Sequence, residues 1–143
     1  SYRLICADLV SALAGLGIPA AFAPVNDIVA GERKISGNAQ TRRKGVFLQH
    51  GTILYTVDVE RMFSLLNVSE VKISDKLIRS VKKRVTCVRE WADVDQAGLI
   101  AALETAFSAS WPVQPGDYTE SELARAKQLA GEKYGSRAWI ALR

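Results

Sequence analysis

The chain has 143 residues, which is enough for one domain with its own hydrophobic core and too few for two ordinary ones. Hydrophobic residues make up 48% and charged residues 24%, so a wholly disordered chain is excluded, and no segment approaches the ~18 apolar residues of a membrane span. The net charge of +4 is uneven: residues 1–89 contain 14 Lys or Arg against 7 Asp or Glu, whereas residues 90–143 contain 5 against 8. The basic part is therefore predicted to contact an anionic partner.

The apolar spacing at the start of the chain predicts an amphipathic helix over residues 2–16, ended by Gly17 and Pro19. Short segments rich in β-branched and aromatic residues follow, separated by turn formers, and they predict a meander of mostly antiparallel strands. These segments are residues 20–23, 26–30, 35–40, 46–50 and 52–57.

Helices are predicted in most of the remaining chain, each after a residue that can cap its first turn. The predicted helices are 59–66 after Asp58, about 76–82 after Ser74 or Asp75, one starting at Asp93 or Asp95 with the apolar stripe Leu99, Ile100, Leu103 and Phe107, and one from Thr119 to about Tyr134. Thr119 and Glu122 have the spacing of a capping box, and residues 85–88 are predicted to be extended. These elements predict an α+β fold, a mostly antiparallel sheet with flanking helices, in one domain over residues 1–143.

The two cysteines, Cys6 and Cys87, are far apart in sequence and match no metal or redox spacing. This predicts half-buried thiols in a reduced, cytoplasmic protein. The apolar start also lacks the positive opening and the cleavage site of a secretory signal.

The stretch from Asn26 to Gln40 carries most of the chemical information. It reads as a β-hairpin with polar residues at its mouth, in which Asp27 and Lys34 can face each other across two strands. Gly37 within the second strand marks a place where a ligand or another backbone comes close. The alternative is purely structural, with the Asn-Asp pair as turn formers, an exposed lysine and a glycine bulge.

Residues 26–54, N-D-I-V-A-G-E-R-K-I-S-G-N-A-Q-T-R-R-K-G-V-F-L-Q-H-G-T-I-L, resemble the lipoate–protein ligase family of the biotin/lipoate ligase superfamily. In that family an Asn-Asp pair, a lysine followed by Ile/Val-Ser/Ala-Gly-x-Ala, and a His-Gly-Thr/Ser strand recur in this order. The flanks agree as well, in residues 17–19, 84–86 and 133–139, so the resemblance covers essentially the whole chain.

The resemblance implies a two-step acyl transfer on a class II biotin/lipoate ligase-like fold. The family's ligases activate lipoate with ATP and Mg²⁺ to lipoyl-adenylate, and then pass the acyl group to a lysine. The acceptors it implies are the lipoyl domains of 2-oxoacid dehydrogenase complexes or the glycine-cleavage H protein, with no membrane and no nucleic acid as partner.

The resemblance also implies roles for individual residues. Lys34 matches the essential lysine that stabilises charge on the acyl carbonyl and the α-phosphate. Asn26 and Asp27 match the adenylate-binding pair, and the Asp27 carboxylate suits ribose hydroxyls or Mg²⁺. The residues carried over as pocket-lining are Ser36, Gly37, Ala39, His50, Gly51 and Thr52.

One signature of the family, an Arg-Arg-x-Thr-Gly-Gly-Gly segment followed by a histidine, does not occur in the chain. It belongs to the upstream part of the catalytic domain, so residues 1–143 are expected to be the C-terminal part of that domain, without an accessory domain. We therefore expect activity to require a complementing N-terminal half, and an accessory subunit is a further candidate partner. The sheet would then have an open edge that the other half covers.

Two enzyme alternatives arise within the superfamily. The cysteine-dependent octanoyltransferases share Ala-Gln-Thr-Arg and Leu-Gln-His-Gly with residues 39–42 and 48–51, but no cysteine lies between Cys6 and Cys87 to act as a nucleophile near Lys34. Biotin ligases have a lysine three residues before their Asn-Asp pair, where this chain has Ala23. A ligase acting on lipoate is thus preferred.

The alternative from another class is a nucleic-acid-binding module, because two basic clusters occur, at residues 33–44 and 72–89. Neither cluster is interleaved with an aromatic platform for stacking bases. The second cluster is instead predicted to dock an acidic lipoyl domain through Lys72, Lys82, Lys83 and Arg84.

Overall fold

The computed structural model describes residues 1–65 and 84–142, which fall into two compact units, Ser1–Pro112 and Val113–Arg143. The first unit contains helix α1 (Tyr2–Gly15), strands β1 (Ala20–Ala23), β2 (Asp27–Ala30), β3 (Arg33–Arg43) and β4 (Val46–Ile53), and helices α2 (Val59–Leu65), η2 (Val88–Glu90) and α4 (Gln96–Ser110). The second contains α5 (Glu120–Leu129), η3 (Ala130–Tyr134) and α6 (Arg137–Ile140). None of the helices in the described ranges combines the length and the hydrophobicity that crossing a membrane requires.

Helix α1 ends as the sequence predicts, because Gly17 has a φ of +79° that favours glycine. The Gly17 N–H donates to the Ala14 carbonyl at 2.9 Å, and the Ile18 N–H donates to the Leu13 carbonyl at 3.0 Å. This is the Schellman pattern, which turns the chain out of the helix and buries Ile18 in the core.

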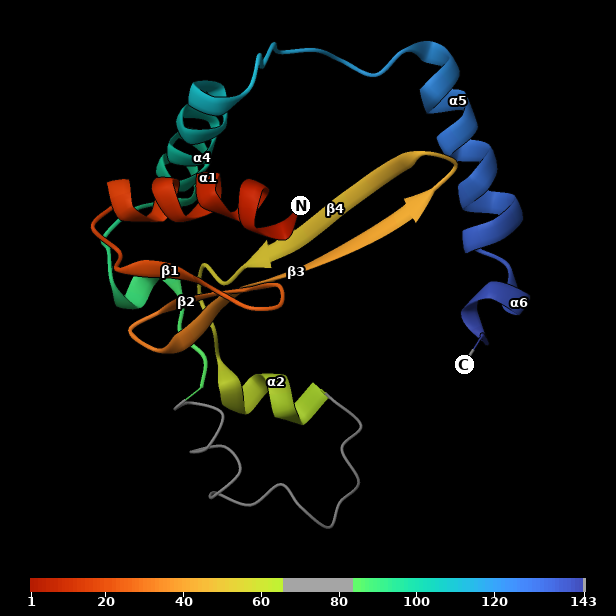
Figure 1. Ribbon diagram of the computed structural model, residues 1–143. Helices are drawn as coiled ribbons and strands as arrows, with labels where there is room; N and C mark the ends of the chain where they lie inside the picture. Colours follow the sequence, from red (N-terminus) through yellow and green to blue (C-terminus); the bar gives the residue numbers. More distant parts are fainter. Residues whose placement is uncertain (66–83, 143) are drawn as a thin grey trace. The chain divides into compact units, whose positions relative to one another are not determined.

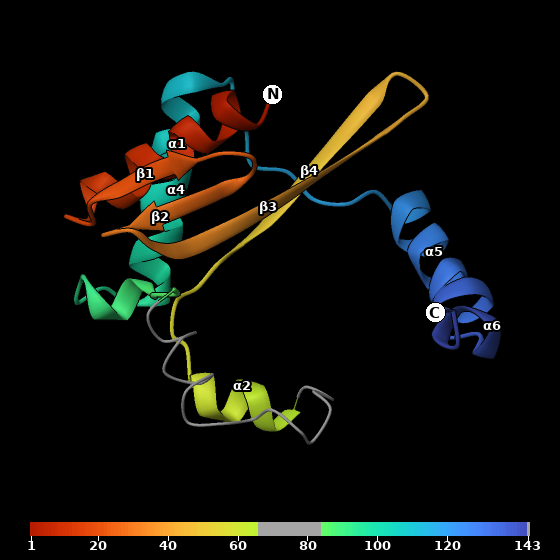
Figure 2. The same cartoon turned by 60° about the horizontal axis from the view of Figure 1, so that its bottom comes forward.

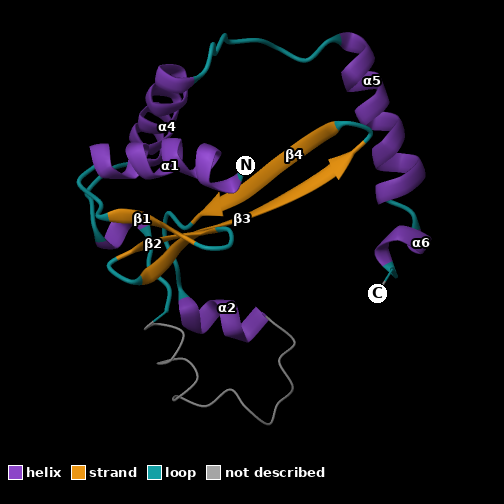
Figure 3. Ribbon diagram, in the orientation of Figure 1, coloured by secondary structure: helices purple, strands orange, loops and turns teal. Residues whose placement is uncertain are grey.

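The four strands form one antiparallel sheet in the order β1-β2-β3-β4. Figure 3 shows that β3 and β4 make a long hairpin, whereas β1 and β2 are short. The prediction of two strands at 46–50 and 52–57 is wrong in one respect, since a single strand runs through Gly51 and ends at Ile53. The antiparallel meander itself is confirmed.

Helices α1 and α4 cover one face of the sheet, where the hydrophobic core lies (Figures 1 and 2). The buried members of the core are Cys6, Leu13, Ile18, Ile28, Ala30, Ile35, Val88 and Leu99. A buried carboxylate on α1, Asp8, ties the two helices together by accepting hydrogen bonds from Ser110 Oγ at 2.6 Å and Trp111 Nε1 at 2.7 Å. Such pairing offsets the cost of taking the charge out of water.

The segment after residue 83 differs in part from its prediction. Only Val85 takes part in strand-like pairing, a single parallel bridge to Lys34, and the 3₁₀ helix η2 begins at Val88 where an extended segment was expected. Helix α4 is capped by Asp95, whose carboxylate accepts the Gly98 N–H at 2.7 Å. The predicted helix at 76–82 lies outside the described residues.

In the second unit the predicted capping box is present: Thr119 Oγ1 accepts the Glu122 N–H, and the Glu122 carboxylate accepts the Thr119 N–H at 2.7 Å. The hydrogen bond from the Thr119 backbone N–H, followed by one from the Thr119 hydroxyl to the same carboxylate, lowers the pKa of Glu122. The helix continues to Tyr134 as predicted, although its last five residues form a π-helical turn. The short helix α6 was not predicted, and Ser136 caps it.

Candidate functional site

A β-bulge decides which side chains meet at the mouth of the β2–β3 hairpin. Ile28 pairs with Ser36 and Val29 pairs with Lys34, so Ile35 is an additional residue on β3. Ile35 and Ser36 are consequently both buried, and Lys34 lies on the opposite face from the core. Asp27, which pairs with Gly37, lies on the same face as Lys34.

Lys34 and Asp27 form an ion pair, with 2.7 Å between Lys34 Nζ and Asp27 Oδ1. The predicted meeting of the two residues across the hairpin is therefore confirmed. The Lys34 side chain extends over Gly37, since a Cβ added there would come within 2.9 Å of both Lys34 Cε and Lys34 Nζ. Glycine thus provides the space that the ammonium occupies, and 44% of the lysine side chain stays exposed.

Asn26 is fixed by Asn38, a residue that sequence reasoning did not single out. The Asn26 carbonyl accepts the Asn38 N–H at 2.9 Å and Asn38 Nδ2 at 3.1 Å, and Asn26 Nδ2 donates to the Asn38 carbonyl. Asn38 Nδ2 also lies 3.3 Å from Ser36 Oγ. Asn38 is 5% exposed, so these contacts satisfy a buried amide and set the start of β2.

Gly51 leaves room for the Asn38 side chain, because a Cβ on Gly51 would lie 3.0 Å from Asn38 Cγ and 3.0 Å from the Gly37 carbonyl oxygen. The glycine of the predicted His-Gly-Thr stretch therefore has a structural reason. The sequence alone does not predict this contact, because Gly51 is seen to face Asn38 only when the register of β3 and β4 is known.

Two cavities flank this part of β3. The smaller, about 150 Å³, is lined by Lys34, Ser36, Gly37, Thr52, Leu54 and Val85. The larger, about 360 Å³, lies between the sheet and the two covering helices, with Ile5, Leu9, Ser36, Asn38, Phe47, Gln49, His50, Gly51, Ile53 and Phe107 as its lining. Of the predicted pocket residues, Gly37 and Thr52 line the smaller cavity, His50 and Gly51 the larger, Ser36 both, and Ala39 neither.

The other predicted residues differ in their relation to Lys34. Ala39 and His50 pair with each other on the exposed part of the β3–β4 hairpin. Arg84 does reach Lys34, because its carbonyl accepts the Lys34 N–H at 2.8 Å. Lys72, Lys82 and Lys83 lie outside the described residues.

The two thiols are more buried than predicted, at 0% exposure for Cys6 and 5% for Cys87, so the expectation of half-buried cysteines is wrong. Cys6 packs in the core, with Gln49 Nε2 at 4.0 Å from its sulfur, and Cys87 Sγ is 3.8 Å from Glu90 Oε1. Burial raises the pKa of the Cys6 thiol, and the hydrogen bond from Gln49 offsets this only in part. Such thiols are poor nucleophiles.

Comparison with known proteins shows which family this chain is similar to. Residues 1–108 match the family model described as the lipoyl protein ligase A/B catalytic domain. A curated relative from Brevibacillus brevis, "Octanoyltransferase LipM", is 32% identical, with 79% of this chain and 42% of the relative covered.

Two solved structures are also similar. A chain from the bi-partite lipoate protein ligase of Thermoplasma acidophilum, a structure described together with its E2 lipoyl domain, has a TM-score of 0.87 and 32% identity and covers 96% of this chain and 56% of that chain. A lipoate-protein ligase A bound with ATP has a TM-score of 0.77 and 29% identity over 96% and 57%. The chain thus spans about half the length of the relatives it matches.

Proposed function

Because the chain belongs to the family of lipoyl protein ligase A/B catalytic domains, we propose that the complete protein is a lipoate–protein ligase that uses ATP. One observation carries the proposal: the Lys34 ammonium is held 2.7 Å from Asp27, over Gly37, and remains partly exposed. The similarity to a ligase bound with ATP supports ATP as a substrate, and the similarity to a ligase described with a lipoyl domain supports a lipoyl domain as the acceptor.

The proposed chemistry has two steps in which the same ammonium acts. First, a carboxylate oxygen of lipoate attacks the α-phosphorus of ATP and pyrophosphate leaves. Second, the amine of a carrier lysine attacks the acyl carbonyl and AMP leaves. Negative charge develops on the α-phosphate in the first step and on the acyl oxygen in the second, and Lys34 stabilises both. We assign adenylate contacts to Asn26, whose backbone carbonyl is held by Asn38, and to Asp27, which pairs with Gly37.

Mg²⁺ enters this proposal with the phosphates of ATP. Among residues 1–65 and 84–142, no group of three or more His, Cys, Asp and Glu residues is arranged to hold a metal ion. Mg²⁺ commonly takes one or two protein carboxylates, with the other ligands coming from phosphates and water. The partly exposed Asp27 carboxylate fits the part of a single such ligand.

Octanoyl transfer is the second candidate, favoured by the similarity to an octanoyltransferase. In the thiol-dependent mechanism a cysteine near the lysine attacks the acyl group. The two cysteines of this chain are buried, and their described hydrogen bonds are to Gln49 and Glu90. Neither thiol is described next to Lys34, which favours the ligase.

Pyrophosphate release distinguishes the two reactions. The complete protein is expected to release pyrophosphate from ATP only when lipoate is present. A double variant, Cys6→Ala with Cys87→Ala, is expected to keep this rate within about threefold, because neither thiol takes part. Transfer of octanoate from an octanoylated carrier without ATP, lost in the double variant, would instead establish the transferase.

We further propose that a lipoyl domain docks on Lys72, Lys82, Lys83 and Arg84. Replacing Lys82 and Lys83 with glutamate is expected to slow association with an acidic lipoyl domain about tenfold at low salt, because complementary charge chiefly raises the association rate. The matched control reverses Arg125 and Lys127, two exposed cations on α5. Association that is insensitive to salt in the unaltered protein would contradict this docking surface.

A further inference from the structure

Residues 84–86 hold the backbone of Lys34 from outside the hairpin. The Lys34 N–H donates to the Arg84 carbonyl at 2.8 Å, and the Lys34 carbonyl accepts the Thr86 N–H at 2.9 Å. Val85, between them, makes the isolated parallel bridge to Lys34. Both polar backbone groups of Lys34 are therefore used by one segment, and the position of that segment sets the position of Lys34.

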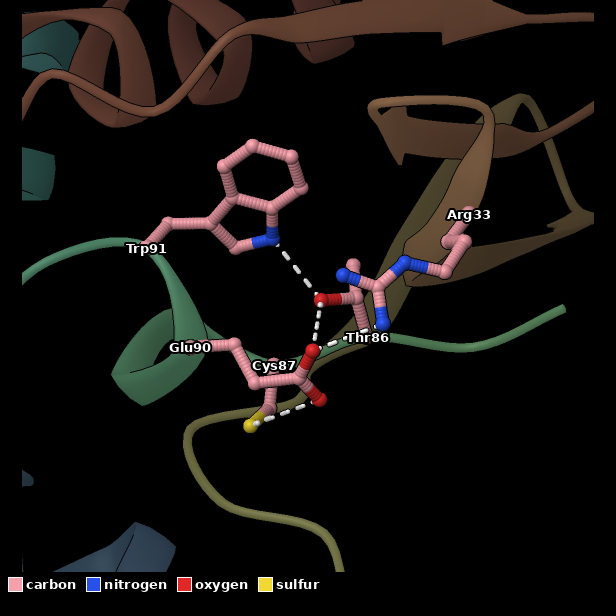
Figure 4. Close-up of polar contacts among 5 residues, drawn as sticks. All are labelled: Arg33, Thr86, Cys87, Glu90 and Trp91. Carbon is pink, nitrogen blue, oxygen red and sulfur yellow. Dashed lines mark hydrogen bonds and ion pairs between the residues drawn. The ribbon is translucent and has the colours of Figure 1, made fainter. Parts of the chain in front are cut away.

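Thr86 is in turn fixed by a network of side chains that converge on one carboxylate (Figure 4). Its hydroxyl accepts a hydrogen bond from Trp91 Nε1 at 2.8 Å and donates to Glu90 Oε2 at 3.2 Å. Arg33 Nη1 is 2.6 Å from the same Glu90 oxygen, and Cys87 Sγ lies near the other. Thr86 is fully buried, and its hydroxyl connects Trp91 to Glu90 through these two hydrogen bonds.

The same network contacts the β2–β3 hairpin through Arg33 and Trp91. Arg33 directly precedes Lys34, and its guanidinium lies 5.7 Å from the centre of the Trp91 ring. Trp91 packs closely against the β2–β3 turn, because a Cβ on Gly31 would come within 2.6 Å of Trp91 Cη2. The two adjacent cations thus have separate partners, Glu90 for Arg33 and Asp27 for Lys34.

We infer that Thr86 and Glu90 are positioning residues, which hold the Lys34 ammonium in the geometry that acyl activation needs; this rests on the proposed function. Without the Thr86 hydroxyl, the N–H of the partly buried Trp91 loses its acceptor and Glu90 loses a donor. The backbone of residues 84–86 is then free to shift, and Lys34 shifts with it. A small misplacement of a catalytic group slows the chemical step more than it weakens substrate binding.

The test compares Thr86→Val, which keeps the shape and removes the hydroxyl, with Thr86→Ser, which keeps the hydroxyl. In the complete protein, the Val variant is expected to lower kcat for lipoate-dependent pyrophosphate release about 10- to 100-fold, with KM for lipoate and ATP changed by less than about threefold. The Ser variant is expected to restore kcat. Amide hydrogen exchange at Lys34 and Thr86 should accelerate in the Val variant and stay slow in the Ser variant.

A full kcat in the Val variant, or a loss shared equally by the Ser variant, would overturn the inference. If the Val variant does not fold, Glu90→Gln replaces it, since the amide has the same size and loses the charge that binds Arg33. Lys34→Ala separates the two proposals. An inactive Lys34→Ala protein beside a fully active Thr86→Val protein refutes only the positioning role, whereas an active Lys34→Ala protein refutes the proposed function.

Discussion

Replacing Lys34 with alanine is expected to abolish acyl-adenylate formation and transfer while the protein stays folded. The loss should reach about 1,000-fold or more, because one preorganised donor at a developing charge contributes 10²–10³-fold and this ammonium is proposed to act in both steps. Pyrophosphate release and acylation of a lipoyl domain, measured separately, should fall together.

The fold should tolerate this substitution because the ion pair that it removes is partly exposed and contributes about 0–1 kcal/mol. The hydrogen bonds of the Lys34 backbone to Arg84 and Thr86 do not depend on the side chain. Thermal unfolding should therefore change little. Lys127→Ala, on the exposed helix α5, is the matched control and is expected to keep the rate of adenylate formation. Near-normal turnover of Lys34→Ala would contradict the proposed role.

Features that depend on local chemistry could be predicted from the sequence. The end of α1 follows from Gly17 and the residues beside it, and the cap of α5 follows from Thr119 and Glu122, because each signal lies within one turn of the structure that it specifies. The facing of Asp27 and Lys34 could also be predicted, since a short turn brings the two strands together.

The bulge at Ile35 could not be predicted in the same way. Strict alternation along a strand puts Lys34 and Ser36 on one face, yet the additional residue buries Ser36 and leaves Lys34 on the other side of the sheet. What selects the bulge is the fit of Ile35 into a core that also contains Ile28 and Val88, and this information is spread along the chain.

Asn38 and Thr86 were missed for a related reason. Asn38 is a buried polar residue whose partner, Asn26, lies twelve residues away, whereas Glu90 and Trp91, the partners of Thr86, follow it by four and five residues. Neither residue stands in a motif whose spacing predicts these contacts. Both contacts satisfy a buried polar side chain, and they are recognised only in the folded structure.

Gly37→Ala is expected to lower activity while the stability of the fold is kept, although the substituted residue carries no charge. An alanine Cβ at this position would lie 2.9 Å from Lys34 Cε and 2.9 Å from Lys34 Nζ, closer than such contacts allow. The atoms that must move are the flexible end of a lysine side chain, so the strand itself can stay in place. Alanine also loses less conformational freedom on folding than glycine, which supports stability.

The cost should instead appear in the chemistry, since the displaced ammonium leaves its position beside Asp27. We expect lipoate-dependent pyrophosphate release to fall about 10- to 100-fold, because misplacing a catalytic group by about 1 Å has this effect. Gly15→Ala is the control: the same change is made in the same unit, and nothing lies within 4 Å of the added methyl group. A Gly37→Ala protein with unchanged melting temperature and full activity would show that the ammonium need not occupy the space above Gly37. A protein that unfolds would show that the strand, rather than the lysine, lacks room for the methyl group.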